Sequence, residues 1–159
     1  MVKPIPDGYH AVTPSITVKS AAKAIEFYKK AFGATEVVRM GEGDRVMHAE
    51  IKIGDSHIML GDEAPGRPTS APTTIGGTTG SIMLYVPDVD RTYKAALDAG
   101  AKSEMAPDNM FWGDRFASVV DPFGHSWSIA THVEDVAPDE MKQRSDAWMA
   151  QMAQMATKK

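Results

Sequence analysis

The chain has 159 residues, 43% of them hydrophobic, which is enough for one well-buried domain or for two half-size modules that share a core. Its formal net charge is −4 and its basic residues form no dense cluster, so nucleic acid is not expected as a partner. The absence of cysteine excludes disulfides, thiolate nucleophiles and cysteine-based zinc sites.

The first elements are a short strand and a helix. In "TPSITVKS", Ile16 and Val18 alternate with polar residues, which is typical of a strand with one buried face. The segment "AAKAIEFYKKAF" that follows has apolar residues at helical spacing. Ser20 is placed to cap this helix, and Gly33 to end it in a left-handed conformation.

Three further strands are predicted from "TEVVRM" and "RVMHAEIKIGDSHIML", the last two joined by a two-residue turn at Gly54 and Asp55. This turn would place Glu50 opposite Met59 and Lys52 opposite His57. Alternation predicts a buried face and an open face for the first of these two strands: Met47, Ala49, Ile51 and Ile53 on the buried face and His48, Glu50 and Lys52 on the other.

The same pattern starts again at Ser81, where "SIMLYV" is followed by a helix that Asp88 can cap and Gly100 can end. Corresponding residues of the two halves lie about 68 positions apart, which indicates an internal repeat. We therefore predict an α+β fold of two βαβββ modules in a single domain spanning 1–159. Its predicted parts are module one at about 12–62, an exposed connector at 63–80 that suits a flap over a cleft, module two at about 81–135, and a helical tail at 136–159.

The tail begins with Pro138 and two acidic residues, and it ends in lysines, as a helix prefers. Its apolar residues recur at alternating spacings of four and three, which gives a mostly apolar stripe: Met141, Ser145, Trp148, Met152 and Met155. A stripe of this kind is typical of packing against another surface. We therefore expect a homodimer.

The repeated βαβββ unit, together with "AIEFYKKAFGA", "GDSHIML", "FWGDR" and "DPFGHSWSIATH", resembles the vicinal oxygen chelate superfamily, most closely its PhnB-like glyoxalase branch. The resemblance covers about residues 12–135. This superfamily includes metal-dependent lyases, isomerases and dioxygenases as well as metal-free bleomycin-binding proteins. The fold that the resemblance implies therefore leaves the function open.

The resemblance also implies where metal ligands would stand. The positions at which metal-dependent members carry His, Gln or Glu correspond here to Thr13, Met59, Ser81 and Ser128. Hydroxyl and thioether groups bind divalent transition metals poorly. We therefore expect no metal and no cofactor, and we assign these positions to ligand contact.

Two further sets of residues are candidates for function. On the open face of the first module, we expect His48 to contact a ligand, and Glu50 is the candidate catalytic acid or base. The alternative is that both are ordinary surface residues. In "NMFWGDRF", Trp112 can stack on a ligand and Arg115 can hold an anionic group. The alternative is that Trp112 plugs the end of the fold and Arg115 bonds to Asp114.

The histidines at the ends of "DPFGHSWSIATH" are interpreted differently. We expect His125 to be structural and His132 to lie on the surface.

The favoured function is metal-free binding of a small hydrophobic or aromatic molecule in a concave cleft. The alternative is a glyoxalase-type lyase or isomerase. It would either bind a metal through His48, Glu50 and His57, which are displaced from the usual ligand positions, or act as a metal-free acid–base catalyst. No apolar run reaches the length of a membrane span, and the N-terminus lacks a secretory signal. We therefore expect a cytoplasmic protein with a small-molecule ligand and without a membrane partner.

Overall fold

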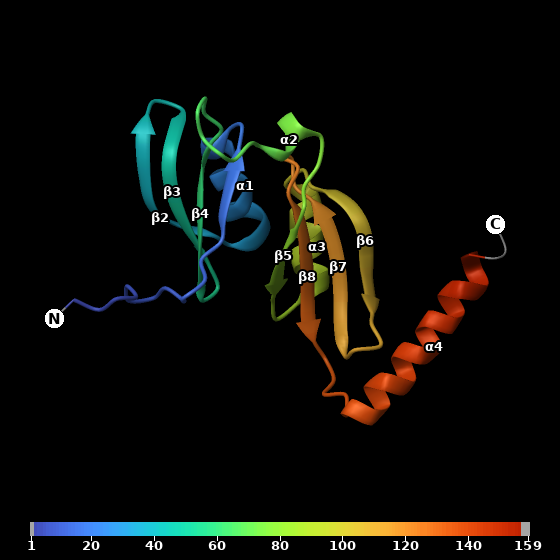
Figure 1. Cartoon of the computed structure of the whole chain (residues 1–159). Helices are drawn as coiled ribbons and strands as arrows, with labels where there is room; N and C mark the ends of the chain where they lie inside the picture. The colour runs from blue at the N-terminus through green and yellow to red at the C-terminus, as the bar shows by residue number, and fades with distance from the viewer. Residues whose placement is uncertain (1, 157–159) are drawn as a thin grey trace.

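The computed structural model describes residues 2–156, which form eight strands and four helices (Figure 1). The sequence-based prediction of two βαβββ modules is confirmed. The elements in chain order are β1 Ser15–Val18, α1 Ala21–Phe32, β2 Thr35–Glu42, β3 Arg45–Ile53, β4 Ser56–Asp62, α2 Pro72–Ile75, β5 Ser81–Tyr85, α3 Val89–Asp98, β6 Lys102–Asn109, β7 Asp114–Val120, β8 Ser126–His132 and α4 Pro138–Ala156.

Each module forms one four-stranded sheet, and the two sheets have the same topology. Their strand orders are β1-β4-β3-β2 and β5-β8-β7-β6, with one parallel pair in each sheet, β1 with β4 and β5 with β8. The predicted hairpin register is confirmed, because Glu50 lies opposite Met59 and Lys52 opposite His57. Gly54 adopts a φ of 59°, a left-handed conformation that favours glycine in this turn.

One hydrophobic core joins the two modules. Apolar residues on the helix-covered sides of both sheets belong to a single buried cluster around α1 and α3. Trp127 of β8 is fully buried, and its ring centroid lies 5.2 Å from that of Tyr28 and 4.6 Å from that of Phe32, both on α1. Tyr28 also donates a hydrogen bond of 2.7 Å across the module boundary to Asp121. The modules are therefore packed together as one unit by aromatic contacts and a buried hydrogen bond.

Two details of the first module differ from the prediction. Ser20 precedes α1 as expected, but its side chain makes no capping hydrogen bond. The buried carboxylate of Asp62 accepts the amide hydrogen of Ala21 in its place, at 2.6 Å. A helix start can thus be capped by a residue that is distant in the sequence, which a local pattern does not reveal.

The predicted buried face of β3 is wrong at Met47, which is 60% exposed, whereas Val46 is fully buried. The pairing of β2 with β3 shifts register between Met40 and Gly41, where Gly41 lies opposite Val46. A β-bulge of this kind inserts an extra residue and reverses the alternation beyond it. A side chain at Gly41 would collide with the carbonyl oxygen of Arg45, so glycine permits the bulge.

The connector between the modules packs against the body of the protein. The carboxylate of Glu63 accepts hydrogen bonds from the amide of Ala71 and the hydroxyl of Thr74, which holds the short helix α2. Ala71 and Pro72 are buried, although most other connector residues are exposed. The Thr69 hydroxyl also lies 2.8 Å from that of Thr17 on β1. These contacts fix the connector along the edge of the first sheet.

The predicted C-terminal helix is confirmed over Pro138–Ala156 as α4, which projects away from the second sheet (Figure 1), and the predicted tail residues 157–159 lie outside the described residues. No residue of α4 is buried. Arg144 binds both carboxylate oxygens of Glu134, at 2.6 and 2.8 Å, and the Trp148 ring contacts Phe111. From Ala147 to Ala156 the helix carries no charged residue. None of the helices within residues 2–156 is long and apolar enough to cross a membrane.

Candidate functional site

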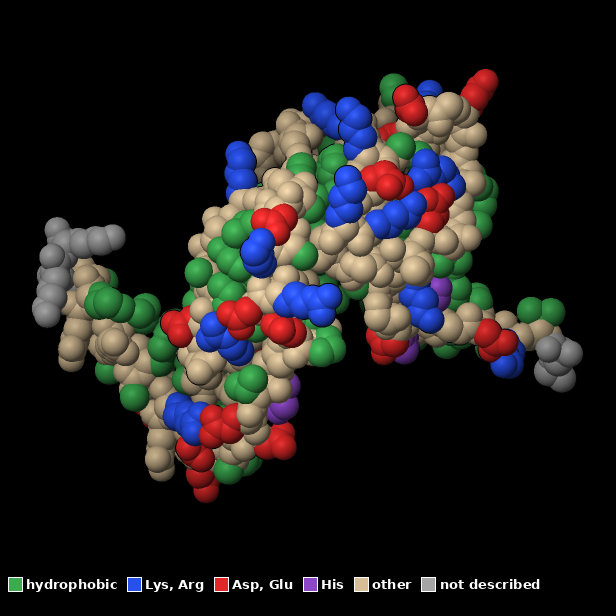
Figure 2. Space-filling model, turned by 180° about the vertical axis from the view of Figure 1, so that it is seen from behind, with side chains coloured by type: hydrophobic (Ala, Val, Ile, Leu, Met, Phe, Trp, Pro, Cys, Tyr) green, Lys and Arg blue, Asp and Glu red, His purple; other side chains and the backbone are tan. Residues whose placement is uncertain are grey.

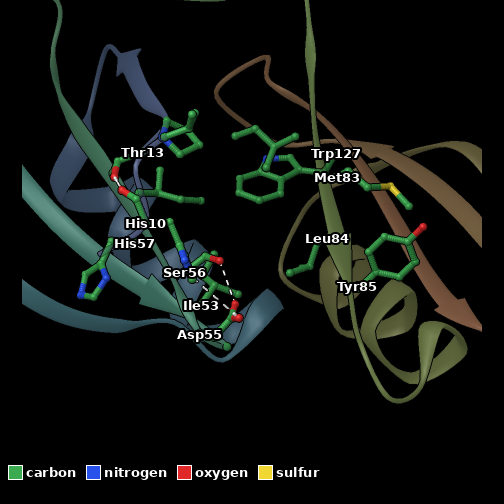
Figure 3. Close-up of a pocket in the computed structure, with 15 residues that line it drawn as sticks. His10, Thr13, Ile53, Asp55, Ser56, His57, Met83, Leu84, Tyr85 and Trp127 are labelled. Carbon is green, nitrogen blue, oxygen red and sulfur yellow. Dashed lines mark hydrogen bonds and ion pairs between the residues drawn. The ribbon is translucent and has the colours of Figure 1, made fainter. Parts of the chain in front are cut away.

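Within residues 2–156, helices cover one face of each sheet and leave the other uncovered, and we call the uncovered faces the first and second open faces. Figure 3 shows how they are directed. Leu84 and Trp127 point toward the first module, whereas Met83 and Tyr85 point to the other side of β5. His57 on β4 points away from the second module. In a single chain the two open faces therefore look in different directions and do not enclose a common cleft.

The first open face carries the predicted pair His48 and Glu50 (β3). The Nε2 atom of His48 lies 3.0 Å from Oε1 of Glu50, and the Glu50 side chain is 16% exposed. The other carboxylate oxygen, Oε2, accepts a hydrogen bond from the hydroxyl of Tyr9. A carboxylate with this enclosure, held between an imidazole and a phenol, has the partners that proton transfer requires.

The N-terminal segment, which precedes β1, lies across this face. The Tyr9 ring stacks on the ring of His57, with centroids 4.0 Å apart and an interplanar angle of 14°. Beside it lies a pocket of about 400 Å³ that brings together the predicted contact residues Thr13 and Met59 and the predicted catalytic residue Glu50. The remaining lining comes from the N-terminal segment itself: Pro4, Ile5, Pro6, Tyr9, His10 and Ala11. Sequence analysis missed Tyr9 because it lies outside the repeated unit.

The second open face centres on Asp114, a carboxylate that is only 3% exposed (β7). One of its oxygens, Oδ2, accepts hydrogen bonds from the Tyr85 hydroxyl at 2.9 Å and from Nε1 of Trp112 at 3.1 Å. The other oxygen, Oδ1, lies 2.8 Å from Nδ1 of His132. The bond that Tyr85 donates to Asp114 is the main cause that raises the pKa of the Tyr85 phenol. Phe116 packs edge-on against Trp112, so the carboxylate organises an aromatic surface.

Tyr85 and Asp114 were not among the predicted contact residues, although a signal was available for Tyr85. It has the same alternation as Ser81 and Met83 in "SIMLYV", so it shares their face of the strand. Its side chain is 60% exposed. A large aromatic residue exposed on a sheet face is a candidate for ligand contact.

The structure places Arg115 on the other side of its strand from Asp114. Its guanidinium forms two hydrogen bonds of 2.7 Å with Asp90 of α3 and does not bond to Asp114. Adjacent residues of a strand point to opposite faces, which explains why this predicted alternative is wrong. Arg115 thus binds Asp90 on the side of the sheet that the helix covers, whereas Trp112 contacts the second open face.

The positions at which metal-dependent relatives carry ligands are divided between the two faces. Thr13 and Met59 line the pocket on the first, whereas Ser81 and Ser128 belong to the strands β5 and β8 of the second. Their hydroxyl and thioether groups do not fit a divalent transition metal. Within residues 2–156, no three His, Asp or Glu side chains are placed to hold one metal ion. We therefore assign no chemical step to a metal here.

The terminal histidines of "DPFGHSWSIATH" have distinct surroundings. His125 lies in the turn before β8, and its Nε2 atom is 3.0 Å from the backbone oxygen of Thr17 in the first module, which confirms a structural position. The His132 side chain is 52% exposed, as expected of a surface residue. A hydrogen bond to Asp135 is the main cause that raises the pKa of His132, and a hydrogen bond to Asp114 raises it further.

A pocket of about 470 Å³ lies between the modules, and its lining also includes His57 of the first open face and Met83 and Tyr85 of the second (Figure 3). Its apolar wall contains Ile53, Ile58, Leu84 and Trp127, whose side chains belong to the joint core. In the view from behind, a notch separates the two lobes, and basic and acidic side chains are mixed over the surface (Figure 2). The pocket is therefore the open end of the core along the boundary between the modules.

Comparison with known families agrees with this architecture. A family model described as the Glyoxalase/Bleomycin resistance protein/Dioxygenase superfamily matches residues 9–129, and the chain belongs to that superfamily. An uncharacterised protein of Mycobacterium bovis is 42% identical over 136 residues, which cover 83% of this chain and 90% of the relative. The protein YjdN of Escherichia coli is 24% identical over 131 residues, which cover 69% of this chain and 86% of YjdN.

Solved structures show the same fold. TioX from Micromonospora sp. has a TM-score of 0.64 and 23% sequence identity, covering 78% of this chain and 99% of TioX. A gene product of Arabidopsis thaliana has a TM-score of 0.63 and 26% identity, covering 76% of this chain and 98% of the Arabidopsis chain. Because one fold hosts many functions, the function has to be argued from the site.

Proposed function

We propose that the protein binds a small aromatic molecule, without a metal ion, on its open faces. The observation that carries this proposal is the aromatic surface around Asp114. Its buried carboxylate orients Tyr85 and Trp112 on a sheet face that no helix covers. Flat, oriented side chains of this kind bind aromatic ligands by stacking, and a few fixed polar groups add specificity.

We further propose that a second copy of the chain completes the cleft. Because the open faces of one chain look in different directions, a twofold-related copy supplies a first open face opposite a second one. The exposed apolar stripe on α4, which includes Trp148 at 43% and Met155 at 49% exposure, supports association. Hydrophobic side chains gather toward the end of this helix in Figure 2.

The test of binding begins with thermal-shift screening of small aromatic compounds. For a compound that binds, Trp112→Ala should weaken the affinity by about 1–3 kcal/mol, the range for loss of a central aromatic contact. Trp112→Phe is the matched control, because it keeps a stacking ring and should retain most of the affinity. Unchanged affinity in a folded Trp112→Ala protein would refute the assignment of this face.

The metal-free part of the proposal has its own test. We expect elemental analysis of the purified protein to find no stoichiometric Zn, Ni, Mn or Fe, and we expect chelator to leave its stability unchanged. About one metal ion per chain, lost in His48→Ala, would overturn this expectation. It would favour a metal-dependent lyase that uses the displaced residues His48, Glu50 and His57.

A second candidate function is metal-free acid–base catalysis of the lyase or isomerase type. The hydrogen bond between His48 and Glu50, on an open face and beside a pocket, favours it. For a compound found by screening, Glu50→Gln should abolish exchange of its acidic carbon-bound protons with deuterated solvent while binding is retained. Absence of exchange in the wild-type protein would leave binding as the function.

A further inference from the structure

We propose that residues 4–11 form a strap whose Tyr9 occupies the first open face as a built-in substitute for the ligand. This inference rests on the proposed binding function and deepens it, because it assigns a chemical class. The ligand that replaces Tyr9 is a flat aromatic ring bearing a hydroxyl or amino group that donates a hydrogen bond to Glu50.

Tyr9 is held in the way a phenol ligand would be. Its ring lies nearly parallel to that of His57, which is only 9% exposed. Its hydroxyl donates to Oε2 of Glu50, whose other oxygen is bonded to His48. Stacking and a hydrogen bond to a carboxylate together specify a ring with a donor group at its edge.

The strap also covers a polar atom without supplying it with a hydrogen-bond partner. Nδ1 of His57 is buried and has no hydrogen-bond partner among the described residues. Buried polar atoms without partners are rare in folded proteins because each one costs free energy. A ligand with a second polar group beside its ring would satisfy this atom, which Tyr9 does not.

Apart from Tyr9, the strap is weakly attached. Its other residues bury little surface: Pro4, Ile5, Pro6, Asp7 and Ala11 are exposed. Gly8 passes close to His57, and it has a φ of 85°, a left-handed conformation that favours glycine. A segment with few buried apolar contacts opens at low free-energy cost, so a ligand can displace it.

The first experiment removes the substitute and adds it back as a free molecule. In Tyr9→Ala, 4-methylphenol, which is the tyrosine side chain as a free compound, should bind at least about tenfold more tightly than to the wild-type protein. Toluene, which has the ring without the hydroxyl, should bind about tenfold more weakly than 4-methylphenol in the same variant. Titrations followed by NMR of the histidine ring protons measure both affinities.

Two variants control this experiment. Tyr9→Phe keeps the ring in place and should gain little affinity for 4-methylphenol. In the double variant Tyr9→Ala, Glu50→Gln, the preference for 4-methylphenol over toluene should fall to less than about threefold. Equal binding of the two compounds to Tyr9→Ala with Glu50 intact would overturn the assignment of a donor-bearing ring.

The second experiment leaves Tyr9, Glu50 and His57 unchanged. Gly8→Ala places a side chain at a left-handed position and strains the closed strap, so 4-methylphenol should bind about fivefold more tightly than to wild type. Gly66→Ala is the matched control, because Gly66 has a similar φ of 80° in the connector and a side chain there meets no atom within 4 Å. If 4-methylphenol bound to Gly8→Ala and Gly66→Ala with equal affinity, the proposed displacement of the strap would be wrong.

The outcomes also separate this inference from the proposed function. If 4-methylphenol does not bind to a folded Tyr9→Ala protein, while a screened compound still binds in a manner that depends on Trp112, only the inference on the strap fails. If no aromatic compound binds to any of these proteins, the proposed function fails.

Discussion

Replacing Asp62 by alanine should destabilise the protein far more than replacing Ser20, the residue that the sequence marks as the cap of α1. The Asp62 side chain is buried and accepts two backbone hydrogen bonds. One comes from the amide of Ala21 at 2.6 Å and the other from the amide of Val46 at 2.7 Å. Asp62 therefore joins the start of α1, the end of β4 and the bulged part of β3.

The expected magnitude follows from these two bonds. Asp62→Ala leaves two amide groups without an acceptor at residues that are fully buried, Ala21 and Val46. Each unsatisfied buried group costs about 1–3 kcal/mol, so the loss should be about 3 kcal/mol. A helix cap is usually worth about 1 kcal/mol, but Ser20 makes no capping bond, so Ser20→Ala should cost less than about 0.5 kcal/mol.

Urea denaturation at one fixed protein concentration measures both effects. Asp55→Ala is the matched control, since it removes the same group from an exposed turn residue and should change stability by less than about 0.5 kcal/mol. Equal costs for Ser20→Ala and Asp62→Ala, or a cost for Asp62→Ala below about 1 kcal/mol, would refute the capping role that we derive for Asp62.

Three further predictions concern the module boundary, the second open face and α4. Tyr28→Phe should cost about 1 kcal/mol in urea denaturation, because it removes a buried hydrogen bond to Asp121 and leaves that carboxylate its other donors; no loss would contradict this. Because Asp135 and Asp114 raise the pKa of His132, the stability that His132 contributes is complete below about pH 6.5 and is lost as the pH rises through the raised value. The difference in unfolding free energy between the wild-type protein and His132→Ala should therefore shrink as the pH rises above about 6.5, and a constant difference would contradict this. Ending the chain after Asp135 should reduce the mass measured by light scattering toward that of a monomer, and a wild-type monomer at tens of micromolar would contradict the dimer.

The fold was predictable because its signals are local and occur twice. Alternation in "SIMLYV", the glycine at the end of α1 and the turn at Gly54 each depend on a few neighbouring residues, and the repeat of about 68 positions confirmed how they combine. The pairing of Glu50 with Met59 followed from the turn length alone, and the structure has this register.

What sequence patterns missed depends on contacts between distant residues. Asp62 caps a helix that starts far from it in the chain, and Tyr9 reaches Glu50 from outside the repeat. The bulge beside Gly41 is a deviation from strict alternation, so the alternation placed Met47 on the wrong face. The directions of the open faces depend on how the two modules pack together, for example through the contacts of Trp127 with Tyr28 and Phe32. The sequence pattern within one module does not reveal contacts of this kind.

The two open faces repeat one arrangement with different consequences. Each has a carboxylate on the third strand of its module that accepts a hydrogen bond from a tyrosine hydroxyl and also contacts a histidine. On the second face the tyrosine belongs to β5, and Trp112 donates a further bond, so exposing Asp114 would require a change in the sheet itself. On the first face the tyrosine comes from a weakly held strap, and moving that strap frees one oxygen of Glu50. We therefore propose that binding that needs a free carboxylate uses Glu50, whereas the carboxylate of Asp114 holds the aromatic surface in shape.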